Sequence, residues 1–403
     1  MTTRVSTRQR TAVKVIAVLA LLSIALHTIV LVVTPFGIHR DEFLYFSMGN
    51  HLRLWHMDFP PAIAILGALS QIVFGHTVAA ARVFPAIEGT ILIILAALLA
   101  REIGGGRFAQ GFAAFAVLAS PLFQRASTLF QPVVLDQICW TLALLAIAKV
   151  ARARAESRDT AHAWLLFGLA IGLGLLSKFS ILFLCASVLL AVILTPARRE
   201  LATPWPWIAV LMMIVIGSPS IVGQISLHFP VVTQMQDLKT TQLEHVSVTE
   251  FLTAPIMYLG PISFLIAIAG ACAMLVRDQL RPFSIVSLSC IIAFVLLLVL
   301  HGKPYYIGPI FPALFAGGGV LLERLSSTKF PKLASATRWS VVVLMTLTSI
   351  ITLPLGVPIL PVAATAQYAS RIAGGAALRN NQGVRDRLPQ DYADMLGWRD
   401  QAA

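Results

Sequence analysis

Residues 162–195 read HAWLLFGLAIGLGLLSKFSILFLCASVLLAVILT, an apolar run whose only charged interruption is at Ser177-Lys178. At 1.5 Å per residue, one helix over this run is about 50 Å long, whereas the hydrocarbon core of a bilayer is about 30 Å thick. The glycines of Gly172-Leu173-Gly174 lie just before the interruption. The run therefore predicts two short membrane-crossing helices, 162–177 and 179–195, with a tight turn at Lys178.

The rest of the chain has the same character, with 58% apolar and only 12% charged residues. Soluble domains carry about 25% charged residues, so this chain has more apolar surface than a soluble core can bury. Because a membrane helix needs roughly 20 mostly apolar residues, we predict an all-α integral membrane protein with eleven spans. They are 13–33, 78–100, 108–123, 132–150, 162–177, 179–195, 206–226, 253–275, 283–300, 305–322 and 339–354. The membrane domain is then 1–354, and 355–403 is a short extracytoplasmic tail.

Basic residues identify the cytoplasmic side, since cytoplasmic loops are enriched in Lys and Arg. With the N-terminus inside, every inner loop of this topology is basic. The inner residues are Arg4, Arg8, Arg10, Lys14, Arg101, Arg107, Lys149, Arg152, Arg154, Arg158, Arg198, Arg199, Arg277, Arg281, Arg324, Lys329, Lys332 and Arg338. The pattern predicts a multi-pass protein of the cytoplasmic membrane, with its N-terminus in the cytoplasm and its tail outside.

The net charge of +12 is explained by these loops. No soluble basic stretch is interleaved with aromatic residues, so we expect the lipid bilayer and no nucleic acid as a partner. The cysteines lie inside apolar runs without metal-ligand spacing, which favours small core residues over disulfides or a zinc site. The cysteines are Cys139, Cys185, Cys272 and Cys290.

The first outer loop, 34–77, begins with the charged stretch His39-Arg40-Asp41-Glu42. Aromatic and polar residues alternate irregularly over 42–54, and 61–74 is apolar but too short to cross. We predict two helices at the membrane surface, the second started by Pro60-Pro61 because proline suits a first helical turn. From position alone, an ordinary solvated loop explains Asp41 and Glu42 equally well.

Other polar residues fall at predicted outer helix ends. Asp136 lies one turn into a span, where an ionisable side chain needs a polar cavity or a partner; Arg125 is an alternative partner. Lys178 lies at the tight turn, and the alternative is a lysine that extends to the interface. Tyr305-Tyr306 before the tenth span also fits an interfacial aromatic belt.

Two features remain open. Glu88 lies near the middle of the second span, either in a buried pair or as a functional carboxylate. The outer loop 227–252 is typical of a solvated loop.

The acidic and basic groups at one membrane surface suit transfer from a phosphorylated donor, because a carboxylate can deprotonate a hydroxyl and cations stabilise a leaving phosphate. The same groups also fit an ion or substrate pathway.

Six stretches, in order along the chain, carry a family resemblance. They are Asp41-Glu42-Phe43 with Tyr45; Asp58-Phe59-Pro60-Pro61; Ala81-Arg82-Val83-Phe84-Pro85 with Ala100-Arg101-Glu102-Ile103-Gly104-Gly105; Leu129-Phe130-Gln131-Pro132 with Asp136 and Trp140; Gly172-Leu173-Gly174-Leu175-Leu176-Ser177-Lys178; and Gly302-Lys303-Pro304-Tyr305-Tyr306. This succession resembles glycosyltransferase family 39, the dolichyl-phosphate-mannose-protein mannosyltransferase-like group related to lipid A aminoarabinose transferases. These are membrane glycosyltransferases of the GT-C fold. Phe59, where His or Gln is common, and Glu88 depart from the family pattern.

The resemblance implies sugar transfer from a polyprenyl-phosphate-sugar donor to a glycolipid, glycan or protein acceptor on the outer face, with inversion. It implies a catalytic or acceptor-orienting carboxylate at Asp41, a Glu42 that orients the acceptor or assists, and a site shaped by Asp136. It further implies donor phosphate binding by Lys178, Lys303, Tyr306 and Arg82, and acceptor or site-shaping roles for Asp58, His56 and Gln131. No cofactor is certain: the resemblance leaves a divalent metal open, and the sequence offers no ligand cluster.

One departure concerns the tail. In similar bacterial proteins the segment resembling 388–398 leads into a further extracytoplasmic domain, whereas this sequence stops at Ala403. If that domain selects the acceptor, the expectation is another strategy of acceptor selection or a loss of activity. The alternatives to a glycosyltransferase are therefore a lipid or solute transporter or flippase, supported by Glu88, and an inactive shortened relative. The sequence specifies neither the sugar nor the acceptor.

Overall fold

The computed structural model describes residues 10–325, 331–372, 378 and 384–398. Arg4, Arg8 and Lys329, used above to predict orientation, lie outside the described residues, as do parts of the predicted tail. Among the described residues every regular element is a helix and none is a strand. The prediction of an all-α membrane protein is confirmed.

The helices follow one another along the chain with short connections. In order they are α1 Val13–Val33, α2 Arg40–Met48, η1 Gly49–His51, α3 Ala62–Phe74, α4 Val78–Glu102, α5 Arg107–Ala119, α6 Pro121–Ala126, α7 Val133–Ala155, α8 Ala161–Ser177, α9 Ile181–Leu194, η2 Pro196–Ala202, α10 Trp205–Ser226, α11 Pro230–Thr241, η3 Leu243–His245, α12 Val248–Leu259, α13 Pro261–Val276, η4 Arg281–Phe283, α14 Ser284–Val299, η5 Pro304–Ile310, α15 Phe311–Arg324, α16 Pro331–Gly356, α17 Val362–Ile372 and α18 Gln390–Ala393.

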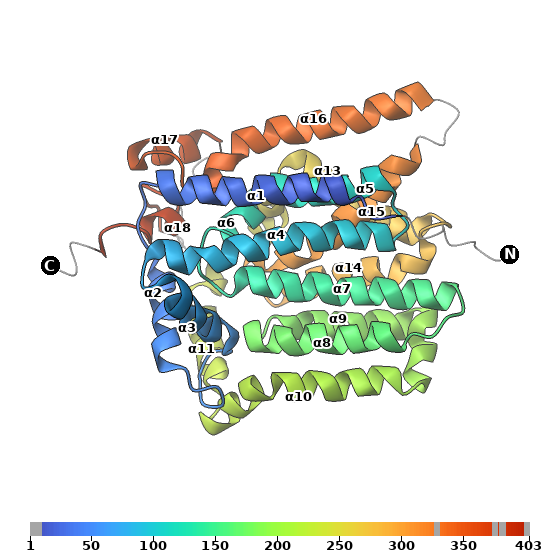
Figure 1. Cartoon of the computed structure of the whole chain (residues 1–403), viewed down its shortest axis with the longest axis horizontal. Helices are drawn as coiled ribbons and strands as arrows, with labels where there is room; N and C mark the ends of the chain where they lie inside the picture. The colour runs from blue at the N-terminus through green and yellow to red at the C-terminus, as the bar shows by residue number, and fades with distance from the viewer. Residues whose placement is uncertain (1–9, 326–330, 373–377, 379–383, 399–403) are drawn as a thin grey trace.

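The long helices lie side by side along one direction, and the short helices α2, α3, α11, α17 and α18 gather at one end of the bundle (Figure 1). We call this end the α2 end. The connections after α4, α7, α9, α13 and α15, which were predicted to be cytoplasmic, lie at the opposite end. The two ends thus separate as the charge pattern predicts, while their assignment to membrane faces stays a prediction.

Close helix packing comes from small residues, as is usual inside membranes, where backbones must approach closely. A Cβ atom added to Gly168 of α8 would meet the backbone of Ala209 in α10, and one added to Gly270 of α13 would meet the backbone of α15. The core lies between α4, α7 and α15, whose inward faces are rich in alanine and leucine. Two of these helices, α4 and α7, also hold polar residues of the α2 end, Arg82 and Asp136.

The predicted number of eleven spans is not confirmed. Within the described residues, seven helices are long and apolar enough to cross a membrane, or up to nine if each bent pair counts as one span. The predicted helix 253–275 is wrong as a single element: α12 and α13 meet at an angle of 109°. Gly260 lies at this bend with a φ of 82°, and Pro261 starts α13.

Helices form in the predicted first loop and on both sides of Lys178, whereas 227–252, predicted as a loop, contains the helix α11. α2 and α3 form in the first loop, although the first helix ends at Met48 and continues only as the turn η1. α3 begins directly after the Pro60-Pro61 pair. α8 ends at Ser177 and α9 begins at Ile181, so Lys178 lies in a tight turn as expected. The proposed division into 1–354 and 355–403 stays a prediction.

Candidate functional site

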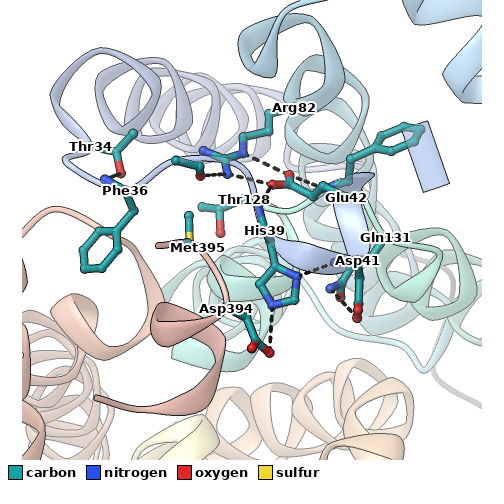
Figure 2. Close-up of polar contacts among 12 residues, drawn as sticks. Thr34, Phe36, His39, Asp41, Glu42, Arg82, Thr128, Gln131, Asp394 and Met395 are labelled. Carbon is teal, nitrogen blue, oxygen red and sulfur yellow. Dashed lines mark hydrogen bonds and ion pairs between the residues drawn. The ribbon is translucent and has the colours of Figure 1, made fainter. Parts of the chain in front are cut away.

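The start of α2 is held by its own residues and by the chain around it. His39 is the N-cap: its Nδ1 accepts a hydrogen bond from the Asp41 backbone N–H at 3.1 Å. The Glu42 carboxylate accepts one from the His39 backbone N–H at 2.8 Å, which completes a capping box. Because a capping box fixes the first helical turn, the directions of the neighbouring Asp41 and Glu42 side chains are fixed as well (Figure 2).

Glu42 points inward and forms a buried ion pair. Its carboxylate is 0% exposed and accepts hydrogen bonds from Arg82 Nε at 3.0 Å and Arg82 Nη2 at 2.7 Å. The backbone N–H of Phe130 donates a further bond at 2.9 Å, and Arg82 also binds the Gly37 carbonyl. Burial raises the pKa of Glu42, but the contacts with Arg82 and the two backbone N–H groups outweigh it and hold the pKa below its usual value. Glu42 is therefore a carboxylate with several hydrogen-bond donors, and it joins α2, α4 and the connection between α6 and α7.

Asp41, one residue earlier, is in a different setting. Its side chain is 40% exposed, and its polar contacts among the described residues are long, with Arg40 Nε and Gln131 Nε2, both at 3.4 Å. Successive helical residues are about 100° apart, so Asp41 leaves the packed interface that Glu42 enters. The resulting arrangement is an accessible carboxylate on a fixed helix, beside the Gln131 amide (Figure 2).

A second group combines Lys178 with aromatic rings. The Lys178 ammonium lies 4.4 Å from the ring centre of Tyr306 and 5.5 Å from that of Tyr305. Burial lowers the pKa of Lys303, two residues before Tyr305. Nearby Lys178 acts in the same direction, whereas Tyr306 and Asp41 oppose it. Lys178, Lys303 and Tyr306, from two distant parts of the sequence, are thus brought together as a cationic group near Asp41.

Asp136 lies beneath this cationic group. Its carboxylate is buried, with 4% exposed, and accepts a hydrogen bond from Ser180 Oγ at 2.7 Å. Lys178 is close enough to act on it electrostatically. The alternative partner considered from the sequence, Arg125, instead contacts the C-terminal part of the chain, where its Nη2 donates to the Asp391 carbonyl at 2.7 Å.

His56 and Asp58 lie on another side of α2. His56 Nδ1 is 3.1 Å from Ser226 Oγ, and the Asp58 carbonyl accepts a bond from Gln224 at 2.7 Å, so both residues are tied to the end of α10. They line an open depression of about 570 Å³. Its other lining residues are Leu44, Ser47, Met48, His51, Met57, Leu227 and Pro230.

Sequence reasoning missed the contribution of residues 388–398, which we call the C-terminal segment. Its Asp394 lies 3.9 Å from His39 Nε2 and 3.4 Å from Arg40 Nη2, so it contacts the start of α2 (Figure 2). The segment was noticed only as part of a family pattern, and no spacing signal in the sequence links it to a helix more than 300 residues away.

One remaining candidate, Glu88, is located but not connected to a role. Glu88 is buried within α4, with 7% exposed, next to the close contact between Gly89 and Ser127. Among the described residues, no group of three or more His, Cys, Asp or Glu side chains has an arrangement suited to a metal ion.

Comparisons with known proteins agree with this architecture. The family model described as dolichyl-phosphate-mannose-protein mannosyltransferase matches residues 58–222, from the Asp58-Phe59-Pro60-Pro61 motif into α10. That range contains Arg82, Gln131, Asp136 and Lys178, while Asp41, Glu42 and Lys303 lie outside it. No curated protein sequence matches the chain significantly.

Solved structures show the same fold at low sequence identity. An oligosaccharyltransferase from Archaeoglobus fulgidus, tethered to an acceptor peptide, is 16% identical with a TM-score of 0.61; the match covers 96% of this chain and 60% of that one. ArnT from Cupriavidus metallidurans bound to undecaprenyl phosphate is 18% identical with a TM-score of 0.62, covering 87% and 72%. AglB from A. fulgidus, in complex with an inhibitory peptide and a dolichol-phosphate, is 17% identical with a TM-score of 0.58, covering 85% and 55%. The chain thus spans 60% of the first of these relatives, and it has the GT-C fold that the sequence resemblance implied.

Proposed function

We propose that this chain is a membrane glycosyltransferase that moves a sugar from a polyprenyl-phosphate-linked donor to an acceptor at the α2 end of the bundle. The observation that carries the proposal is the contrast within α2. Glu42 is neutralised by Arg82, while the adjacent Asp41 is 40% exposed and lies near the cations Lys178 and Lys303. An accessible base beside a phosphate-binding group is what such a transfer requires.

The reaction follows from these positions. Asp41 accepts the proton of the acceptor hydroxyl as the hydroxyl oxygen attacks the anomeric carbon of the donor sugar. The new glycosidic bond forms as the bond between that carbon and the phosphate oxygen breaks, and the electron pair leaves with the polyprenyl phosphate. Attack from the side opposite to the phosphate inverts the anomeric configuration.

The cationic group stabilises the leaving phosphate. An ammonium is a compact charge with three hydrogen-bond donors, and the rings of Tyr305 and Tyr306 hold that of Lys178 in place. Lys303 contributes a second, largely buried positive charge, which strengthens its interaction with a phosphate as charge develops. The Tyr306 hydroxyl is a further donor. A lipid-linked donor would approach these residues from the bilayer.

The other predicted residues support this centre in our proposal. Glu42 and Arg82 form hydrogen bonds with each other and with nearby backbone groups, which suits positioning of α2 better than contact with substrate. Asp136 and Ser180 shape the floor beneath Lys178. Gln131 orients Asp41, and the depression at His56 and Asp58 is a place for part of the acceptor.

The membrane orientation is part of the proposal. The loops at the end opposite to α2 carry most of the basic residues, so that end faces the cytoplasm by the positive-inside rule. The site then lies on the extracytoplasmic face of the cytoplasmic membrane, where it meets a glycolipid, glycan or protein acceptor.

Reconstituted protein tests the function directly. Vesicles holding the purified protein and undecaprenyl phosphates with a radiolabelled sugar should pass the label to an envelope extract. Comparative mass spectrometry of envelope glycolipids, glycans and glycoproteins, with and without the protein, identifies the product. Movement of the lipid-linked sugar between leaflets without any transfer would instead support a flippase and overturn the proposal.

Replacing Lys178 with Ala is expected to weaken binding of undecaprenyl phosphate by about 10- to 100-fold, the loss of one hydrogen bond to a charged group. Lys178→Arg keeps the charge and should retain part of the affinity. Lys239→Ala, at an exposed position on α11, is the matched control. Fluorescence-detected binding to the lipid in detergent measures the effect. An unchanged affinity in Lys178→Ala would remove Lys178 from the phosphate site.

A further inference from the structure

The C-terminal segment is anchored against the start of α2. Tyr392 is 2% exposed, its hydroxyl donates to the carbonyls of Pro354 and Leu355, and its ring packs 5.0 Å from that of Phe36. Backbone bonds join the segment to the first loop: Gly37 N–H donates to the Met395 carbonyl and Arg40 N–H to the Asp394 carbonyl. Buried aromatic packing and paired backbone groups make this segment part of the folded α2 end.

Asp391, in this segment, is held at its backbone while most of its side chain is exposed. Arg125 Nη2 donates to the Asp391 carbonyl at 2.7 Å, and the Arg125 guanidinium lies over the neighbouring Tyr392 ring at 4.5 Å. The Asp391 carboxylate is 62% exposed, and within the described residues it forms one ion pair, with Arg125 Nε at 3.6 Å. Arg125 therefore contacts the Asp391 backbone carbonyl at a shorter distance (2.7 Å) than the Asp391 carboxylate (3.6 Å).

The Asp391 carboxylate also acts on both halves of the site. Burial lowers the pKa of Lys303, and Asp391 and Asp41 both act against that lowering. Burial likewise lowers the pKa of His39, the cap of α2, and Asp391 is the strongest of the opposing groups. The geometry places Asp391 at the start of α2, because Asp394, one helical turn later, lies 3.9 Å from His39 Nε2 and 3.4 Å from Arg40 Nη2, next to Asp41.

We propose that Asp391 accepts hydrogen bonds from the hydroxyl groups of the sugar being transferred and thereby takes part in selecting that sugar. The inference rests on the proposed function. In that function the sugar lies between its phosphate, bound by Lys178 and Lys303, and the base Asp41. A carboxylate beside this space has two oxygens that can each accept bonds from adjacent hydroxyls, and such charge-assisted bonds are stronger than neutral ones.

The alternative is that Asp391 only fastens the C-terminal segment to Arg125. The two roles differ in what they change. A fastening role affects stability and every ligand alike, because the start of α2 is shared by the whole site. A sugar-binding role affects only ligands that carry a sugar and leaves the bare lipid phosphate unaffected.

Binding to the full-length protein separates these roles. The probes are undecaprenyl phosphate and a panel of undecaprenyl-phosphate hexoses and pentoses, each measured with wild type, Asp391→Asn and Asp391→Glu. In wild type, the preferred sugar-bearing lipid should bind more tightly than undecaprenyl phosphate. Asp391→Asn should reduce the affinity for the preferred sugar-bearing lipid, relative to that for undecaprenyl phosphate, by about 10- to 100-fold. The affinity for undecaprenyl phosphate itself should stay within about twofold of wild type, and the melting temperature should not change. Asp391→Glu should restore part of the difference, and Asp237→Asn, at an exposed carboxylate on α11, should change nothing.

Three other results would contradict the proposed role of Asp391. If Asp391→Asn keeps the full sugar preference, Asp391 does not contact the sugar. If it weakens both kinds of lipid equally and lowers the melting temperature, its role is to fasten the segment. If wild type binds undecaprenyl phosphate and every sugar-bearing lipid equally weakly, the proposed function itself fails, and this inference fails with it.

Discussion

Asp41→Asn is expected to reduce sugar transfer by about 10²- to 10⁴-fold, the contribution typical of general base catalysis. Asparagine has nearly the shape of aspartate, but its amide cannot accept the proton of the acceptor hydroxyl. The Asp41 side chain is 40% exposed, and within the described part of the chain its polar contacts are long, so little structure depends on it. Rates of label transfer from an undecaprenyl-phosphate sugar in vesicles measure the effect.

The Asp41→Asn variant should keep its membrane insertion, melting temperature and affinity for undecaprenyl phosphate. Asp237→Asn, which removes an exposed carboxylate from α11 at the same end of the bundle, controls for a general loss of negative charge. Transfer by Asp41→Asn at a rate near that of wild type would show that another group acts as the base.

Glu42→Ala is expected to destabilise the fold by about 3–5 kcal/mol, the usual result of removing one partner from a buried ion pair. Arg82, only 3% exposed, would be left with an uncompensated charge, and the backbone N–H groups of His39 and Phe130 would lose their acceptor. A lower melting temperature in detergent, or retention of the variant in aggregates, is the measurement.

The double variant Glu42→Leu with Arg82→Met separates stability from chemistry. Replacing both charged partners with apolar residues removes the unpaired charge, so much of the lost stability should return. If Glu42→Ala instead melts like wild type but fails to transfer sugar, Glu42 contacts the acceptor, as the family resemblance implied. The proposal that Glu42 positions α2 would then be wrong.

Several parts of the fold could be read from the sequence because the bilayer restricts the choices. The run 162–195 is too long for one crossing and has one charged break, so two helices around Lys178 were predicted and are confirmed. The second surface helix after Pro60-Pro61 follows equally from chain chemistry. The bend between α12 and α13 had a signal that was missed, since Gly260-Pro261 is a dipeptide typical of turns.

The candidate site was only partly predictable. The polar residues at the outer helix ends were found because an ionisable side chain near a membrane needs a reason to be there. The separate roles of these residues could not be predicted, because Asp41 and Glu42 are adjacent carboxylates that look alike in a sequence. Which of them is buried depends on where Arg82 of α4 and the backbone of Phe130 lie.

The sequence by itself determined that the chain is a bundle of membrane helices with its charged groups divided between two ends, because hydrocarbon thickness and the cost of burying charge leave few other arrangements. Only the tertiary structure decided that Arg82 neutralises Glu42 and leaves Asp41 accessible, and that the C-terminal segment packs against the start of α2. These pairings join residues far apart in the chain. They depend on how the helices pack, and no local pattern of residues encodes a contact over that separation.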